Sequence, residues 1–270
     1  MAWQNRDSTD FPSGDWSSLS DELRLKSLMI PRIHCPTAAL GLNILDATAS
    51  HHLVRVLRLP AGASVELFNG RGEEGRGRMT QADALACQVT LESFAQVRRE
   101  SPVRTLILQS LCLADKMDWI VQKSTELGGA EIWPIRAARC QLQLEGLRAE
   151  KRVAHWQRTA EAAAAQCGRN QIPVVRPIMS LQQALKAFES APLRPTGWML
   201  DPFAQTTLGQ APLGPEVWIA VGPEAGWTDE EEAQAARAGL VGLRLGPRVL
   251  RTETAATVIL SAIAVRSGEF

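Results

Sequence analysis

The sequence lacks any long apolar run. No stretch approaches the roughly 18 uninterrupted apolar residues that a membrane-spanning helix needs. Residues Gln4 to Asp10 are polar where a secretory signal peptide would carry its apolar region. We therefore expect a cytoplasmic protein with no membrane partner.

Metal-binding and disulfide patterns are also missing. The chain has five cysteines, an odd number, and no Cys-x-x-Cys pair, so we expect reduced residues of the core. His51-His52 and His34-Cys35 have no further ligands at a spacing that would complete a four-ligand site. The sequence predicts no metal ion.

An excess of positive charge, which would attract nucleic acid, is absent as well. The chain holds 29 basic and 29 acidic residues; residues 1–28 carry three and five, residues 29–100 eight and seven, and the remainder eighteen and seventeen. Without a basic field, any contact with nucleic acid must be local, and the composition suits a small-molecule enzyme equally well.

The 270 residues suit two modest domains with packed cores. Residues 1–28 are rich in Ser and Asp and predict a mobile extension. Short alternating runs from about Ile30 to Val97 predict a small β-barrel, and Arg98 to Pro102 predicts a linker. We place the domains at 29–99 and 100–270.

A glycine run inside the barrel, Gly70 to Gly75, matches the dinucleotide-binding fingerprint by letters alone. That fingerprint needs a helix after its last glycine, whereas Arg76 to Thr80 continues as a strand, and Asn69-Gly70 is a hairpin turn signal. We therefore reject a nicotinamide enzyme.

Strands and helices alternate after Arg104, which predicts an α/β domain with a mainly parallel sheet. The expected strands are 105–111, 131–135, 174–177, 197–200, 217–221 and 241–245; the expected helices are 115–127, 151–167, 181–190, 228–239 and 254–266. Because threaded chains are very rare, the pattern alone predicts an unknotted doubly wound fold.

Two strand-to-helix loops near the C-terminus predict a ligand pocket. Each follows an apolar strand and opens with Gly-Pro, and Thr228 to Glu231 fits a capping box that begins a helix. Ligands of such sheets bind at the carboxyl ends of the strands, where Leu200, Gly222 and Gly246 fall. Glycines there let the backbone approach a bound molecule closely.

The loops read Gly222-Pro-Glu-Ala-Gly-Trp227 and Leu245-Gly-Pro-Arg-Val-Leu-Arg-Thr-Glu-Thr-Ala255. They resemble the SPOUT superfamily of RNA methyltransferases, and within it the family that methylates N3 of a uridine in 16S ribosomal RNA. Segments 29–33, 116–128 and 161–169 extend the resemblance. Ala225 stands where the family has glycine, so a positive φ there would be strained.

The resemblance implies a PUA-like RNA-binding β-barrel followed by an α/β domain whose C-terminal loops form a trefoil knot. It implies S-adenosylmethionine as cofactor, 16S rRNA or the small ribosomal subunit as partner, and a homodimer. The cofactor-binding residues that it implies are Leu200, Gly222, Pro223, Glu224, Gly226, Leu245, Gly246, Leu250, Thr252, Thr254 and Ala255. Proposed RNA contacts are Arg32, Lys116, Lys123 and Arg169 within matched segments, and Arg55 and Arg58 on an expected helix of the small domain.

Methylation of a uridine N3 needs removal of a proton or stabilisation of the anionic base. Arg251 and Glu253 are the predicted catalytic residues, with Glu224 as a further candidate. Arg251 would stabilise negative charge on a uracil oxygen or hold a phosphate. Glu253 would accept the proton or simply stabilise the start of the last helix.

Two other functions remain open at this stage. A related SPOUT enzyme acting on another rRNA position or on tRNA would share the cofactor loops. A non-catalytic RNA-binding or ribosome-assembly protein is conceivable because of Ala225, and it would not bind the cofactor.

Overall fold

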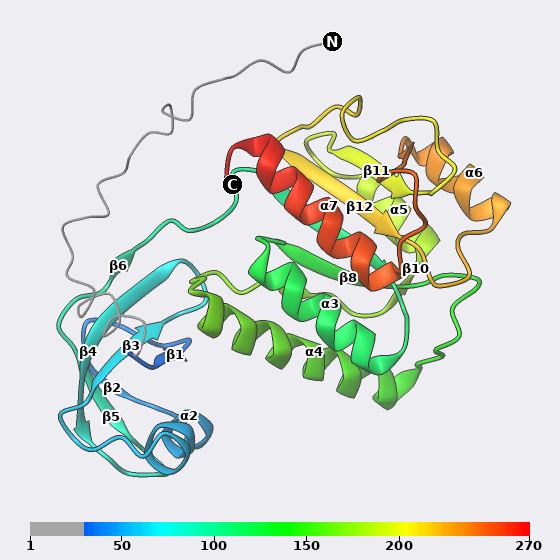
Figure 1. Cartoon of the computed structure of the whole chain (residues 1–270). Helices are drawn as coiled ribbons and strands as arrows, with labels where there is room; N and C mark the ends of the chain where they lie inside the picture. Colours follow the sequence, from blue (N-terminus) through cyan, green and yellow to red (C-terminus); the bar gives the residue numbers. More distant parts are fainter. Residues whose placement is uncertain (1–29) are drawn as a thin grey trace.

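The computed structural model describes residues 30–270, which form a small β-sheet followed by a larger sheet flanked by helices (Figure 1). The extension predicted for residues 1–28 lies outside the described residues. Within them, no helix is both long enough and apolar enough to span a bilayer.

The small sheet contains six strands: β1 (Arg32–His34), β2 (Gly41–Ile44), β3 (Ser64–Phe68), β4 (Glu73–Gln81), β5 (Gln88–Leu91) and β6 (Ala95–Gln96). Their order is β1-β3-β4-β5-β2, with β6 added alongside β4, and only the β1–β3 pair is parallel. Alternate residues of these strands enclose a core that includes Val65, Leu67 and Met79. The short strands β1 and β2 were not predicted individually.

The glycine run lies at the turn between β3 and β4. Asn69 Oδ1 accepts hydrogen bonds from the backbone amides of Arg71 and Glu73, and Gly70 and Gly72 have φ values of +76° and +108°. β4 then continues antiparallel to β3, with no helix at this point. The predicted turn at Asn69-Gly70 and the strand that continues after it are therefore confirmed.

The only helical segment of the small domain within residues 30–99 is short and changes pitch. Asp46 caps α2 (Ala47–His51), which runs directly into a π-helical turn, η1 (His52–Val56). Arg55 lies in this turn, but Arg58 lies beyond it with a φ of +54°. The prediction that Arg58 is helical was wrong, because the chain must reverse direction before β3.

The large sheet is entirely parallel, and its order is β10-β8-β7-β12-β11-β13 with β9 beside β8. Its strands are β7 (Arg104–Ser110), β8 (Glu131–Arg136), β9 (Val174–Val175), β10 (Met179–Ser180), β11 (Thr196–Leu200), β12 (Glu216–Val221) and β13 (Val241–Leu243). Strands β7 and β12 are central and almost wholly buried, as expected for strands covered on both faces.

Helices cover both faces of this sheet: α3 (Ala114–Glu126), α4 (Gly146–Cys167), α5 (Leu181–Glu189), α6 (Asp229–Ala238) and α7 (Thr252–Ser267). Figure 1 shows α3, α4 and α7 side by side on one face, with α5 and α6 packed together on the other. The capping box predicted at the start of α6 is present, with Thr228 and Glu231 bonded to each other's backbone amides.

The chain after β13 does not simply leave the edge of the sheet. Arg244 forms a bridge with Thr207, in the long connection between β11 and β12, and the chain then turns back so that α7 packs on α3, β7 and β12. Near its other end, the Arg266 guanidinium donates to the carbonyls of Leu208 and Ala211 in the same connection. The C-terminal segment and connection 201–215 are thus bound together at two places.

Candidate functional site

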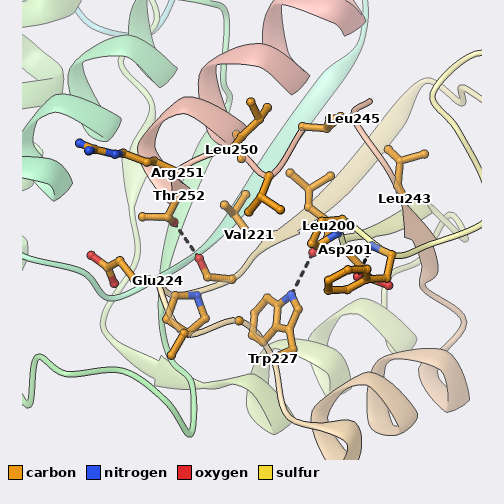
Figure 2. Close-up of a pocket in the computed structure, with 18 of the residues that line it drawn as sticks. Leu200, Asp201, Val221, Glu224, Trp227, Leu243, Leu245, Leu250, Arg251 and Thr252 are labelled. Atoms are coloured by element: carbon orange, nitrogen blue, oxygen red, sulfur yellow. Dashed lines mark hydrogen bonds between the residues drawn. The ribbon is translucent and has the colours of Figure 1, made fainter. Parts of the chain in front are cut away.

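A cleft of about 550 Å³ lies at the carboxyl ends of β11, β12 and β13, within the range of small-molecule sites (Figure 2). Its walls come from the loop after β11, the loop after β12, and the segment between β13 and α7. Apolar side chains dominate these walls: Leu200, Val221, Leu243, Leu245, Leu250 and Ala255. The two Gly-Pro loops therefore do face one another, as predicted.

The floor of the cleft depends on Trp227. Its ring is 6% exposed, and its Nε1 donates to the carbonyl of Leu200 at 3.2 Å. A Cβ on Gly222 would lie 3.2 Å from this ring, which is tighter than nearly all real contacts. Glycine at 222 is thus needed for the ring to join the first loop to the end of β11, and Trp227 is a core residue, as the sequence suggested.

A buried hydrogen-bond chain joins the two loops. Thr252 Oγ1 donates to the carbonyl of Gly222 at 2.7 Å (Figure 2), and Gln109 Nε2 of β7 donates to Thr252 Oγ1 at 2.9 Å. Because Gln109 and Thr252 are buried, the contacts fix the start of α7 against the end of β12.

The alanine in the first loop adopts an ordinary conformation. The positive φ of this loop, +70°, belongs to Gly226, and Arg58 is the only non-glycine residue with positive φ among residues 30–270. Ala225 therefore carries no strain, and the concern raised by its departure from glycine was unfounded.

Charged groups gather at one side of the cleft. Lys116 Nζ of α3 lies 2.7 Å from Glu224 Oε1 in the first loop and 3.9 Å from Glu253 Oε2 in α7. The hydrogen bond to Glu224 holds the pKa of Lys116 above its ordinary value. Lysine 116 is consequently a fixed cation that joins α3 to the first loop.

Arg251 is the N-terminal cap residue of α7 and lines the cleft on this same side. Its side chain is exposed, and none of its nitrogens has a hydrogen-bond partner among residues 30–270. Figure 2 shows its guanidinium on the side of the cleft where Glu224 lies, away from Asp201. It is free to bind an incoming anionic group.

The opposite side of the cleft is acidic; the sequence placed Asp201 at this end of the sheet, but it did not indicate Glu232 or the acidic character of this side. Asp201 and Glu232 both line it, and burial together with nearby Asp201 and Asp229 raises the pKa of Glu232. Exposed Phe203 also lines this side. Only the position of Asp201 directly after a buried strand could have indicated it.

Arg139 was missed as well. It comes from the connection between β8 and α4, and its guanidinium donates to the carbonyl of Trp227 at 2.6 Å and to that of Ala225. No motif marks it, because its partners are backbone atoms some 90 residues later in the chain.

Most residues predicted to hold the cofactor line this cleft. Thr254 does not, because the lining residues Thr252 and Ala255 are three apart on one side of α7 and Thr254 lies on another side. Of the predicted catalytic residues, Arg251 lines the cleft and Glu253 does not. Glu253 lies in the first turn of α7, and its Oε2 is buried without a hydrogen-bond partner.

Two predicted RNA contacts, Arg32 and Arg169, are instead engaged inside the protein. Arg32 pairs with Glu66 and Glu74 at 2.7 Å each and donates to the carbonyl of Arg169. Arg169, 6% exposed, pairs with Glu100 and donates to the carbonyls of Thr125 and Gly129. The contacts of both side chains connect the small domain to the large one, and they give no support to direct RNA contact.

The remaining predicted RNA contacts are accessible to different extents. Lys116 belongs to the charged side of the cleft, Lys123 pairs with Glu126 at 2.9 Å, and Arg55 and Arg58 are exposed on the small domain.

No cluster of three potential metal ligands occurs among residues 30–270. All five cysteines are free; four are buried as predicted, whereas Cys167 at the end of α4 is exposed.

Comparison with known proteins adds to this geometry. A family model described as "RNA methyltransferase domain" matches residues 99–264, and one described as "RNA methyltransferase PUA domain" matches residues 45–92. A Bacillus subtilis protein named ribosomal RNA small subunit methyltransferase E is 32% identical over 229 residues, which cover 80% of this chain and 87% of that protein.

Solved structures are similar over nearly the same length. A Legionella pneumophila protein, solved with the bound cofactor SAM, superposes with a TM-score of 0.82 at 34% identity. The small-subunit rRNA methyltransferase E of Neisseria gonorrhoeae, solved with S-adenosylmethionine, gives 0.81 at 32% identity. Each match covers 88% of this chain and 98% of the other. The predicted fold, a PUA-like β domain followed by a trefoil-knotted α/β domain, is confirmed, and the unknotted alternative was wrong.

Proposed function

The chain belongs to the RNA methyltransferase family that includes the proteins named ribosomal RNA small subunit methyltransferase E, and from this premise we propose that it transfers a methyl group from S-adenosylmethionine to N3 of a uridine in 16S ribosomal RNA. The observation that carries the proposal is the position of Arg251, an unpaired cation at the edge of an apolar cleft built by the two Gly-Pro loops.

The residues of the cleft fit S-adenosylmethionine. Leucine and valine side chains offer an apolar site for an adenine ring, while Asp201 and Glu232 offer acceptors for hydroxyl or ammonium groups. The bound cofactor supplies a methyl group activated by a sulfonium centre. The loops around it exclude water and hold the acceptor in line for displacement.

The target base would enter beside Arg251. N3 of uridine carries a proton that must be removed before or during methyl transfer, and its removal places negative charge on the uracil oxygens until the methyl group is received. The guanidinium of Arg251 would donate to such an oxygen and stabilise that charge. Because Glu224 lines the cleft and Glu253 does not, Glu224 is the better placed of the two carboxylates to take the proton.

We also propose a homodimer and the three-part division into residues 1–28, 29–99 and 100–270. Helix α7 is rich in apolar residues on every side, and Val265 is 61% exposed on it, which supports a contact with a second copy along this helix. The family-model match at 45–92 falls within the first proposed domain, and the match at 99–264 begins one residue before the second.

The test is methyl transfer from labelled S-adenosylmethionine to unmethylated small subunits, free 16S rRNA and bulk tRNA, followed by nucleoside identification. We expect 3-methyluridine from subunits or 16S rRNA. Another methylated nucleoside would keep the enzyme class and overturn the N3 assignment. Cofactor binding without transfer to any of the three RNAs would overturn the proposed substrate, and failure to bind the cofactor would favour a non-catalytic RNA-binding protein.

A further inference from the structure

Helix α4 carries a segregated row of basic side chains, although the protein as a whole has no net charge. At 3.6 residues per turn its basic residues fall within about 120° of the helix surface, whereas Glu150 and Glu161 lie on another side. We call this row the α4 basic stripe; it comprises Arg148, Lys151, Arg152, His155 and Arg158.

The cations of the stripe are available for binding. Arg148, Lys151 and Arg158 are exposed, and neither they nor Arg152 lies within 4.0 Å of a carboxylate in the part of the chain that the structure describes. Many other arginines of the protein are paired, among them Arg32, Arg76, Arg99, Arg104, Arg169 and Arg176. Four unpaired cations on one helix face repel one another, and an anionic partner relieves that repulsion.

The one carboxylate that contacts the stripe is already engaged. Asp118 of α3 accepts from Trp156 Nε1 and lies 3.0 Å from His155 Nε2. Beyond this contact, a groove of about 340 Å³ between α3 and α4 is lined by polar and small residues: Gln122, His155, Arg158, Thr159, Ala162, Ala163 and Gln166. Its amide and hydroxyl groups are suited to phosphate and ribose oxygens.

The stripe lies between the cleft and the small domain. Residues 137–145, which lead into α4, include the cleft residue Arg139, and near the other end of the helix Arg32 of β1 donates to the carbonyl of Ala164. In Figure 1 α4 runs from the cleft end of the large sheet toward the small sheet. Arg148 and Arg158 are about 15 Å apart along the axis, a span that covers several phosphates of one strand.

Resting on the proposed function, we infer that the α4 basic stripe binds the phosphate backbone of the substrate RNA between the small domain and the methyl-transfer cleft. Arginine binds phosphate bidentately, and such contacts position a nucleic acid without reading its sequence. Although the protein has no net positive charge, the α4 basic stripe concentrates positive charge along the proposed path of the RNA.

A charge-matched pair of variants tests the inference. The stripe variant carries Arg148→Gln, Lys151→Gln and Arg158→Gln; the control carries Lys186→Gln, Arg194→Gln and Arg237→Gln, which lie in or near α5 and α6 on the other face. Equilibrium binding of unmethylated 16S rRNA and of small subunits is measured at several salt concentrations, together with S-adenosylmethionine affinity and the kcat and KM of transfer.

We expect the stripe variant to bind free 16S rRNA at least about tenfold more weakly, with a salt slope reduced by about two to three, because three phosphate contacts are lost. KM for RNA should rise while kcat and cofactor affinity stay the same, and the control should remain within about twofold of wild type. Should the triple variant lose cofactor binding through misfolding, Arg148→Gln and Arg158→Gln singly should each lower the slope by about one.

A stripe variant with the RNA affinity and salt slope of the control would overturn the inference. Weaker binding to subunits with unchanged binding to free rRNA would also overturn it, in favour of an acidic ribosomal protein as the partner. Wild-type protein that binds rRNA through the stripe but methylates none of the RNAs would refute the proposed function and leave the stripe assignment standing.

Discussion

At the scale of single residues, the cleft combines a few fixed contacts with two exposed arginines, Arg248 and Arg251. Trp227, Thr252 and Lys116 are each held by named partners, whereas Arg251 has none within residues 30–270. Groups that are fixed before binding keep the two loops in place, and the free group is left to meet the substrate.

Arg251→Ala should abolish most turnover and leave cofactor binding nearly unchanged. Loss of one group that stabilises developing charge lowers kcat by roughly a hundredfold or more. Single-turnover transfer and calorimetric titration of S-adenosylmethionine measure the two effects. A near-normal kcat would remove Arg251 from the mechanism, and Arg194→Ala, an exposed arginine that does not line the cleft, is the control.

The two carboxylates near Lys116 can be separated by conservative substitution. Glu224→Gln should lower kcat more than Glu253→Gln, because Glu224 lines the cleft and Glu253 does not. The comparison is made on kcat across pH, since a lost proton acceptor also changes the pH profile. If Glu253→Gln is the more damaging, Glu253 has the chemical role and the position of its side chain changes when substrate binds.

Gly222→Ala should weaken cofactor binding and lower stability by about 1–3 kcal/mol. The added methyl group would lie 3.2 Å from the Trp227 ring and push it from the floor of the cleft. Thermal unfolding and cofactor titration measure the change. Gly209→Ala, where nothing lies within 4 Å, is the control and should behave as wild type.

At the scale of helices and strands, the sequence predicted those features that depend on contacts between residues close in sequence. The capping box of α6, the Asn69-Gly70 turn and the apolar central strands were all read correctly because each depends on neighbours in sequence. The π turn at His52–Val56 and the short β1 had no such signal. Three arginines have backbone partners that are far away in the sequence, which the spacing of residues in a motif cannot indicate: Arg139, Arg32 and Arg169.

The side chain of Glu131 in β8 contacts a segment that follows this strand in the sequence, and it should make the stability of the protein depend on pH. Burial alone would raise the pKa of Glu131, but hydrogen bonds from Arg176 and Trp133, together with Arg104, hold it below the ordinary value. The stabilisation is present above the unfolded-state pKa and is lost as pH falls through the lowered folded-state pKa. Thermal unfolding between pH 3 and 7 should show a steeper acid loss for wild type than for Glu131→Gln; parallel curves would contradict this.

At the scale of the whole molecule, the two domains are joined by buried ion pairs. Arg32 and Arg169 meet at the end of α4, and Glu66, Glu74 and Glu100 supply the negative partners. The resemblance predicted both domains but placed these arginines on the RNA. Both side chains are largely buried and their N–H groups are hydrogen-bonded within the protein, which assigns them to the contact between the two domains.

Arg169→Ala should destabilise the protein by roughly 3–5 kcal/mol, because Glu100 and the carbonyls of Thr125 and Gly129 would lose their donor. Denaturant unfolding measures the loss, and Arg98→Ala, an exposed neighbour in the linker, is the control. If Arg169 served mainly to bind RNA, the variant would keep its stability and lose RNA affinity.

The contacts between the C-terminal segment and connection 201–215 affect the order in which the protein folds during its synthesis. Apart from Lys116 and Arg139, the residues that line the cleft come from the segment between β11 and α7, so the site is complete only after α7 has been translated and has packed against connection 201–215. The preceding domain can fold earlier, as domains synthesised first generally do. A nascent chain stalled before Thr252 would therefore hold a finished small domain and no complete cofactor site, and a delay between synthesis and activity would measure the docking of the last helix.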